Sequence, residues 1–252
     1  MNKFLGNPER SRASDSQFFQ YACIYSAIPL GICTLGGLLA PMFFPPLSPS
    51  LTAEETVQYY RDHEKGIQAG AVLLQWASVF YLAFTIAISN QLQRIPNLHY
   101  TVKALQVVAG GLSSLCFLFI GIVLALASYR LKRNVEITQA LNDLFWFLTV
   151  MASPPFIAQY FAFGYAILTD NSTRPQFPKL AGVLNMIVCV LFIPQSVSVH
   201  LVKTGPVAWD GVVSFWIPLV LWDLSLALDF ICLIRAMSLS IKTHVSEEVV
   251  ID

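Results

Sequence analysis

The stretch from Trp209 to Ala236 decides the fold, and it reads WDGVVSFWIPLVLWDLSLALDFICLIRA. As a helix it would extend about 42 Å, and a bilayer core of about 30 Å requires only about 20 apolar residues. Two acids, Asp223 and Asp229, nevertheless lie inside it. Each costs roughly 2.5–3.5 kcal/mol near the bilayer centre, whereas a Leu, Ile, Phe or Val returns about 0.3–0.6 kcal/mol. The stretch therefore predicts a membrane span whose acids need a polar lining, a partner or a proton.

The composition of the whole chain is typical of a membrane protein. Of its 252 residues, 56% are hydrophobic and 12% are charged, which is about half the charged fraction of a typical soluble domain. The formal net charge is zero, so the chain offers no electrostatic attraction to a nucleic acid. We expect a lipid bilayer as its surroundings and no nucleic-acid partner.

Five further hydrophobic runs precede this stretch, and each is long enough to cross a bilayer. The predicted spans cover residues 22–44, 67–89, 104–128, 138–168, 180–202 and 209–236. The sequence thus predicts an all-α fold, a polytopic membrane bundle of six transmembrane helices within residues 22–237. A polar N-terminal tail (1–21) and a polar C-terminal tail (238–252) flank it. We expect no cleavable signal peptide, because the first twenty residues lack an apolar core.

Two local patterns refine this topology. Thr52-Ala-Glu-Glu55 has the spacing of a capping box, which predicts a short interfacial helix over residues 53–65 after the first span. The span at 138–168 contains Pro154-Pro155 in its middle, and proline has no backbone N–H to continue the helical hydrogen bonds. We expect a break there, with the freed carbonyl groups facing protein or water rather than lipid.

An even number of spans puts both termini on one side of the membrane. With the termini inside, nine Lys and Arg residues lie on the inner side and six on the outer side. The positive-inside rule then favours termini in the cytoplasm. The glycosylation sequon Asn171-Ser-Thr173 would also face the cytoplasm and stay unmodified.

Polar residues inside the spans are the candidate functional groups. Asp223 and Asp229 lie six residues apart, about 240° around a helix, so they do not share a face. Trp216 lies on the helical stripe of Asp223, and Trp222 lies on the stripe of Asp229. Spans four and five add the polar residues Asn142, Asp143, Gln159 and Asn185.

These residues favour acid–base chemistry on a lipophilic substrate. A buried Asp that keeps its proton can donate it to an alkene, an epoxide or a carbonyl, and Trp faces can stabilise a developing cation. Asp223 is the candidate proton donor, with Asp143 or Asp229 as its orienting or base partner. The candidate substrate-binding residues are Trp216 and Trp222, as cation-facing walls, together with Asn142, Gln159 and Asn185. The leading hypothesis is a membrane-embedded cyclase or isomerase acting on an isoprenoid or polyketide.

Two other classes of function stay open. Protonatable acids also suit a proton-coupled small-molecule transporter, although the chain has no evident inverted repeat of the kind found in many such proteins. An intramembrane Asp can also serve only as a hydrogen-bonding group between helices. In that case Asp223 and Asp229 would be structural, and the protein would be a non-catalytic membrane scaffold.

The sequence carries no pattern that indicates a metal or a cofactor. Its four histidines are spread along the chain, its five cysteines all fall in hydrophobic runs, and the H-E-x-x-H, G-x-S-x-G and Walker A motifs are absent. We expect no bound metal, no cofactor and no disulfide framework.

Four segments carry a resemblance to known proteins. They are Leu51–Tyr60, Glu136–Asp143, Phe177–Lys179, and Lys203–Gly211 together with Phe215–Pro218. In these segments the chain resembles an uncharacterised family of six-span bacterial integral membrane proteins, which implies the bundle and the loop order but no assigned activity. The family pattern includes Asn142-Asp143 and does not require Asp223 or Asp229. In size and buried carboxyls the chain is also similar to small integral-membrane terpene cyclases, by analogy only, because their sequence motifs are absent.

Overall fold

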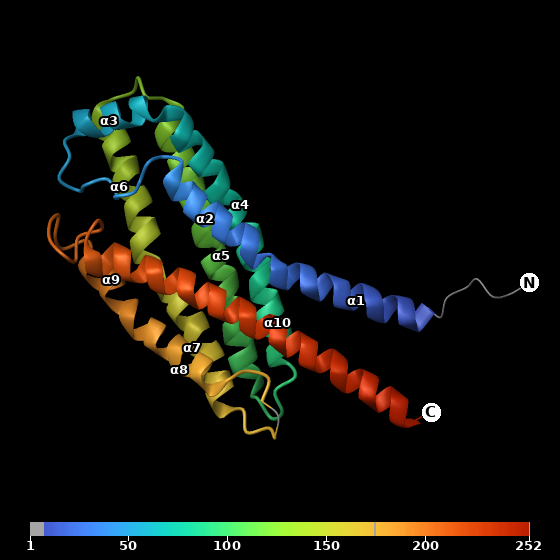
Figure 1. Cartoon of the computed structure of the whole chain (residues 1–252). Coiled ribbons are helices and arrows are strands. Elements are labelled where there is room, and N and C mark those ends of the chain that lie inside the picture. Colours follow the sequence, from blue (N-terminus) through green and yellow to red (C-terminus); the bar gives the residue numbers. More distant parts are fainter. Residues whose placement is uncertain (1–7, 174, 252) are drawn as a thin grey trace, which may run out of the picture.

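The computed structural model describes residues 8–173 and 175–251, and the side chains of residues 17–173 and 175–239. In chain order the elements are α1 (Pro8–Tyr25), α2 (Ala27–Leu39), α3 (Ala53–Asp62), α4 (Glu64–Leu92), α5 (Tyr100–Tyr129), α6 (Val135–Met151), α7 (Ser153–Thr169), α8 (Lys179–Leu191), α9 (Ile193–Ser198), the π-helix η1 (Val212–Trp216) and α10 (Ile217–Ile251). The described ranges contain no β-strand. Figure 1 shows a bundle of long helices, with α1 and α10 extending beyond it on the same side.

Six helical segments are long and apolar enough to cross a membrane. They are Gln17–Leu39 (α1 and α2), Glu64–Leu92 (α4), Tyr100–Tyr129 (α5), Val135–Thr169 (α6 and α7), Lys179–Ser198 (α8 and α9) and Val212–Leu239 (η1 and the first part of α10). The predicted all-α bundle of six spans is confirmed. The protein is a multi-pass integral membrane protein.

Several helix ends differ from the predicted spans. The first apolar segment covers 17–39 rather than 22–44, since Pro41 has no N–H to continue the helix and the chain turns at Met42, whose φ is 60°. The fifth ends at Ser198 rather than at residue 202. Helix α1 already begins at Pro8 and α10 runs on to Ile251, so much of the two predicted polar tails is helical.

Helix α3 lies across one end of the bundle, where the sequence predicts an interfacial helix (Figure 1). The Thr52 hydroxyl accepts a hydrogen bond from the Glu55 amide at 3.2 Å, and the Glu55 carboxylate accepts one from the Thr52 amide at 2.8 Å. This reciprocal pair is the capping box that the spacing predicts, and it satisfies two amides left without helical partners. The helix ends at Asp62, earlier than predicted, and α4 begins at Glu64.

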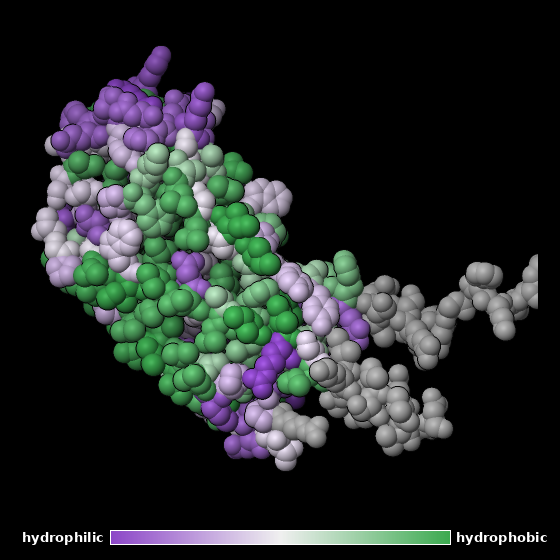
Figure 2. All heavy atoms as spheres, in the orientation of Figure 1, coloured by the Kyte–Doolittle hydropathy of each residue, from purple (hydrophilic) through white to green (hydrophobic). Residues whose placement is uncertain are grey.

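The surface of the bundle suits a lipid surrounding. In Figure 2, hydrophobic side chains cover much of the flank of the bundle, and hydrophilic ones are concentrated at the end that carries α3 and at the opposite end. Large apolar side chains on successive turns of α5 are exposed, among them Val108, Leu112, Leu115 and Phe119. Lipid tails are as apolar as these side chains, so their exposure costs nothing in a bilayer.

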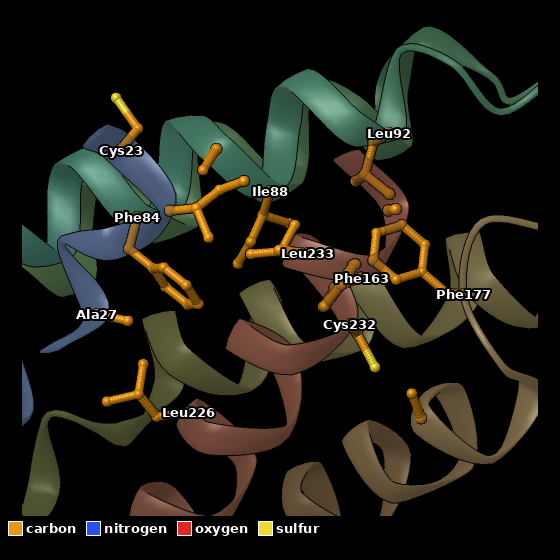
Figure 3. Packing of buried hydrophobic residues seen from close by; sticks show 14 of the residues in the cluster. Cys23, Ala27, Phe84, Ile88, Leu92, Phe163, Phe177, Leu226, Cys232 and Leu233 are labelled. Carbon is orange, nitrogen blue, oxygen red and sulfur yellow. The ribbon is translucent and has the colours of Figure 1, made fainter. Parts of the chain in front are cut away.

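The interior contains buried apolar side chains contributed by several spans. Figure 3 shows Phe84, Ile88, Phe163, Leu226 and Leu233 in one cluster, drawn from α4, α7 and α10. Because lipid offers helices no hydrophobic force to associate, this packing stabilises the bundle through van der Waals contact.

Glycines allow α2 and α4 to approach closely. A Cβ atom added at Gly70 would lie 2.7 Å from the Gly37 carbonyl oxygen and 2.6 Å from Cγ of Pro41. One added at Gly66 would overlap the carbonyl oxygen of Ala40. Small residues at such crossings are the usual device of membrane helices, and here they fix the end of α2 against α4.

Candidate functional site

The fourth, fifth and sixth spans each contain an interruption of regular α-helix, and the first is divided between α1 and α2 as well. The fourth span breaks at Ala152, between α6 and α7, and the fifth breaks at Phe192, between α8 and α9. The sixth begins with the π-helix η1, a rare form that often marks functional sites. The residues Ala152, Phe192 and Ser214, one from each interruption, all line a single cavity.

Prolines explain the interruptions in the fourth and fifth spans. Pro154 and Pro155 lie in the first turn of α7, and Pro194 lies in the first turn of α9. Each lacks the amide that would continue the preceding helix. Pro154 thereby removes the donor for the carbonyl of Val150, which lines the cavity. The Ser153 hydroxyl donates to the carbonyl of Phe192 at 3.3 Å, so it joins the first two breaks. The predicted break in span four is confirmed, and irregular backbone of this kind is tolerated where it faces protein or a cavity.

The cavity has a volume of about 130 Å³ and is partly open. Its walls are largely apolar and include the aromatic side chains of Phe117, Phe156, Phe192, Phe215 and Trp222. No charged side chain is found among its lining residues in the described part of the chain. An apolar protein cavity of about 150 Å³ is large enough to hold benzene. This cavity can therefore hold one ring, or the end of one branched chain, of an uncharged molecule.

A smaller cavity of about 20 Å³ has Trp222 as a wall as well. Asp229 lines it, with only 3% of its surface exposed. The Asn185 side-chain amide donates to Asp229 Oδ1 at 3.2 Å and also donates to the Ala181 carbonyl at 2.9 Å. The Asn185 carbonyl oxygen is buried and has no hydrogen-bond partner among the described residues. The carboxyl of Asp229 is thus buried beside an acceptor that a carboxylic acid proton could satisfy.

Polar side chains from three helices surround this smaller cavity. The Tyr81 hydroxyl on α4 donates to Gln159 Oε1 on α7 at 2.8 Å. The Tyr160 hydroxyl shares a hydrogen bond of 2.7 Å with Ser225 on α10. Both tyrosines and Gln159 line the cavity together with Asp229. Four of the candidate residues therefore meet here, namely Gln159, Asn185, Trp222 and Asp229.

Asp223 lies on a different face of α10. Its stripe contains Trp216, Val220 and Ala227, all of which are exposed, and Asp223 itself is partly buried. It lines neither of the two cavities just described and forms no hydrogen bond with the described residues. The helical spacing correctly separates the two acids, and the structure places Asp229 inward. Trp216 contacts Phe44 and Phe215 instead, with ring centroids 5.9 Å and 5.3 Å away.

Asn142 and Asp143 belong to another part of the bundle, near α3. The Tyr60 hydroxyl donates to Asn142 Oδ1 at 3.2 Å, and the Asn142 amide donates to Asp143 Oδ1 at 3.5 Å. Burial, with a smaller contribution from the charge of Asp143, raises the pKa of Tyr60, so the hydroxyl stays protonated as a donor. Neither residue lines the cavities beside Trp222. Their visible role is to join α3 to α6.

The sequence reading missed Gln195, which lies on α9 and lines the larger cavity. The signal was present, because Gln195 directly follows Pro194 inside an apolar span, and a polar residue beside a helix break is a candidate ligand group. Among the residues that the structure describes, no three His, Cys, Asp or Glu side chains are grouped to hold a metal ion.

Comparisons with known proteins identified no relative of this chain. No family model matches the chain, and searches of curated proteins and of solved structures returned no match either. The resemblance to six-span bacterial membrane proteins stays a prediction. The chain itself supplies the evidence for its class, which is the set of six membrane-spanning helices.

Proposed function

We propose that this protein is a membrane-embedded enzyme that binds a lipophilic small molecule in the larger cavity and isomerises or cyclises it by acid–base chemistry. The observation that carries the proposal is the pair of adjoining cavities that share Trp222. One is apolar and large enough for a ring, and the other holds a deeply buried carboxyl. Binding sites of this kind combine an apolar pocket with a few convergent polar groups.

Asp229 is the proposed acid and base, in preference to Asp223. Its carboxyl lines the cavity behind Trp222, whereas Asp223 lies on the outer stripe of α10. The reacting group of the substrate would reach past Trp222 into the smaller cavity, where a neutral Asp229 would donate its proton to an alkene, an epoxide or a carbonyl. The resulting carboxylate would then accept a proton from the neighbouring carbon of the cationic intermediate, which restores the acid and leaves a rearranged double bond or a ring.

The aromatic walls have a defined part in this chemistry. Protonation of an alkene or epoxide generates positive charge on carbon, and the faces of aromatic rings attract such charge. Phe117, Phe156 and Trp222 pack against one another along the cavity, with centroids 5.8 Å apart for the two phenylalanines and 5.9 Å for Phe117 and Trp222. The faces of these rings offer water no hydrogen-bond partner, which disfavours the water that would otherwise capture the cation. An isoprenoid or a polyketide is the substrate class that fits.

A proton-coupled transporter is the second candidate. It is favoured by the breaks in the fourth and fifth spans, because discontinuous helices form the substrate sites of many secondary transporters. The same buried carboxyl would then carry the coupled proton. In both functions a lipophilic molecule binds in the same cavity. An enzyme would convert this molecule into a product, whereas a transporter would move it across the membrane unchanged.

Expression in a host that demonstrably supplies isoprenoid and polyketide precursors tests the proposal. Lipophilic extracts of cells with and without the protein are compared by mass spectrometry. We expect a product that appears only with the protein. Uptake or release driven by a proton gradient in proteoliposomes, with no new product in cells, would identify the transporter instead. Identical extracts despite correctly inserted protein, together with no flux, would contradict both functions.

A further inference from the structure

Most polar side chains in the wall of the larger cavity are already hydrogen-bonded within the protein. Thr34 donates to the carbonyl of Leu30 at 2.9 Å, and Thr149 donates to that of Phe145 at 2.7 Å. Ser214 donates to the carbonyl of Val207 at 2.9 Å, and Ser153 and Cys116 likewise donate to backbone carbonyls. These groups give up their donor to the backbone, so they contribute little to recognising a ligand.

Gln195 is the exception. It lines the cavity and is only 7% exposed, yet its side-chain amide forms no hydrogen bond with any residue that the structure describes. A primary amide carries two N–H donors and one carbonyl acceptor. The polar atoms of Gln195 are not among the fully buried ones without a partner, so the amide keeps some accessible surface although the residue as a whole is nine-tenths buried. A polar group with so little access to water gains from a partner that a ligand in the cavity can supply.

The fold also determines where the Gln195 side chain lies. It lies on α9, directly after Pro194 and three residues past the break at Phe192. That short helix places the amide in a wall that also contains apolar side chains such as Phe215, Leu219 and Trp222. An unpaired amide in such a wall distinguishes a ligand that carries a matching polar group from one that does not, because the wrong ligand leaves the amide unsatisfied.

We propose that Gln195 recognises the single polar group of the ligand, and that this group is an uncharged hydroxyl or carbonyl. The ligand is then a neutral lipophile, an alcohol or a ketone, with its apolar part against the aromatic walls. A carboxylate or an amine is disfavoured, because none of the described residues that line the cavity carries a charge to balance it. This inference rests on the proposed function, since it takes the larger cavity as the substrate site, and it names the substrate class.

Photolabelling tests the proposal on the whole protein in lipid nanodiscs. Three diazirine probes of equal chain length are used, namely an eight-carbon alcohol, the corresponding ketone and the corresponding alkane. Labelled positions are mapped by peptide mass spectrometry, with Phe156 and Trp222 as markers of the cavity. In the wild type we expect the alcohol or the ketone to label the cavity about tenfold more than the alkane, the effect of one good hydrogen bond. The comparison of alcohol with ketone shows which group the amide prefers.

The substitution Gln195→Met keeps the length of the side chain and removes its hydrogen bonds. It should reduce alcohol and ketone labelling to the alkane level while alkane labelling stays unchanged. Gln68→Met, at an exposed position on α4, is the matched control and should behave as the wild type. A polar preference that survives Gln195→Met, in protein with an unchanged melting temperature, overturns the role of Gln195 but not the cavity. Absence of cavity labelling by all three probes contradicts the proposed substrate site itself.

Discussion

Replacing Gly66 by leucine should abolish folding of the protein. A Cβ atom at this position would overlap the carbonyl oxygen of Ala40, which is backbone and cannot rotate away. The larger side chain would force α4 away from the end of α2. It would also displace the connector that leads from α2 to α3. Overpacking of a tight contact typically costs about 1–3 kcal/mol, and a backbone collision in a close helix crossing belongs at or above the upper end of that range. Size-exclusion chromatography of tagged protein in detergent should show no monodisperse peak for Gly66→Leu.

The chain offers matched controls for this prediction. At Gly111, on α5, an added Cβ atom would meet nothing within 4 Å, and the same holds at Gly31 on α2. Alanine at either position should fold normally and raise the melting temperature slightly, because glycine inside a helix costs about 0.5–1 kcal/mol relative to alanine. Gly66→Ala should instead lower the melting temperature. If Gly66→Ala and Gly111→Ala had the same stability, the close packing of α2 on α4 would be wrong.

The substitution Asp229→Asn should remove catalysis while the protein stays folded. The new side-chain amide can still accept the hydrogen bond from Asn185, and it can also donate to the Asn185 carbonyl oxygen, which has no partner in the native structure. The melting temperature should therefore be equal or higher. An amide cannot transfer the proton, so turnover should fall by about 10²–10⁴-fold, the usual contribution of a general acid or base. The measurement is product formation per inserted protein in membranes.

Asp223→Asn is the matched control for that experiment. It makes the same chemical change six residues earlier on α10, on the stripe that lines neither cavity. We expect product formation close to that of the wild type. The reverse result, with turnover lost in Asp223→Asn and kept in Asp229→Asn, would return the proton donor to Asp223. Full turnover in both variants would exclude acid–base chemistry by either residue.

Much of the fold could be predicted from the sequence, because membrane spans are long and the residues that begin or break a helix are close to it in the sequence. The hydrophobic runs locate six helices, Thr52 and Glu55 have the spacing of the capping box that forms, and Pro154-Pro155 marks the break in the fourth span. Each of these features depends on neighbours within a few residues. The break at Phe192 and the π-helix Val212–Trp216 were not predicted, since a single proline in a span can equally cause only a kink.

The candidate site was harder to predict because lipid and protein interior are equally apolar. In a soluble helix the polar face shows which residues point outward, but on α10 both faces are apolar. Helical spacing could separate Asp223 from Asp229 and could not say which of them faces inward. The bond from Tyr60 to Asn142 joins residues 82 positions apart, so no local pattern indicates it. The sequence marks Gln195 as a polar residue beside Pro194 in an apolar span, but that it lines a cavity without a hydrogen-bond partner among the described residues is known only from the structure.

The most direct test of the central claim, that a lipophile binds in the cavity where the interruptions of the last three spans meet, is native mass spectrometry of purified protein. We predict one tightly bound lipophilic molecule per chain in the wild type, and none in Ala152→Phe, whose ring would occupy the larger cavity at the break in span four. Ala227→Phe, on the exposed stripe of α10, should retain it. Wild-type protein that carries only exchangeable bulk lipid, or equal occupancy in a folded Ala152→Phe variant, would contradict the account.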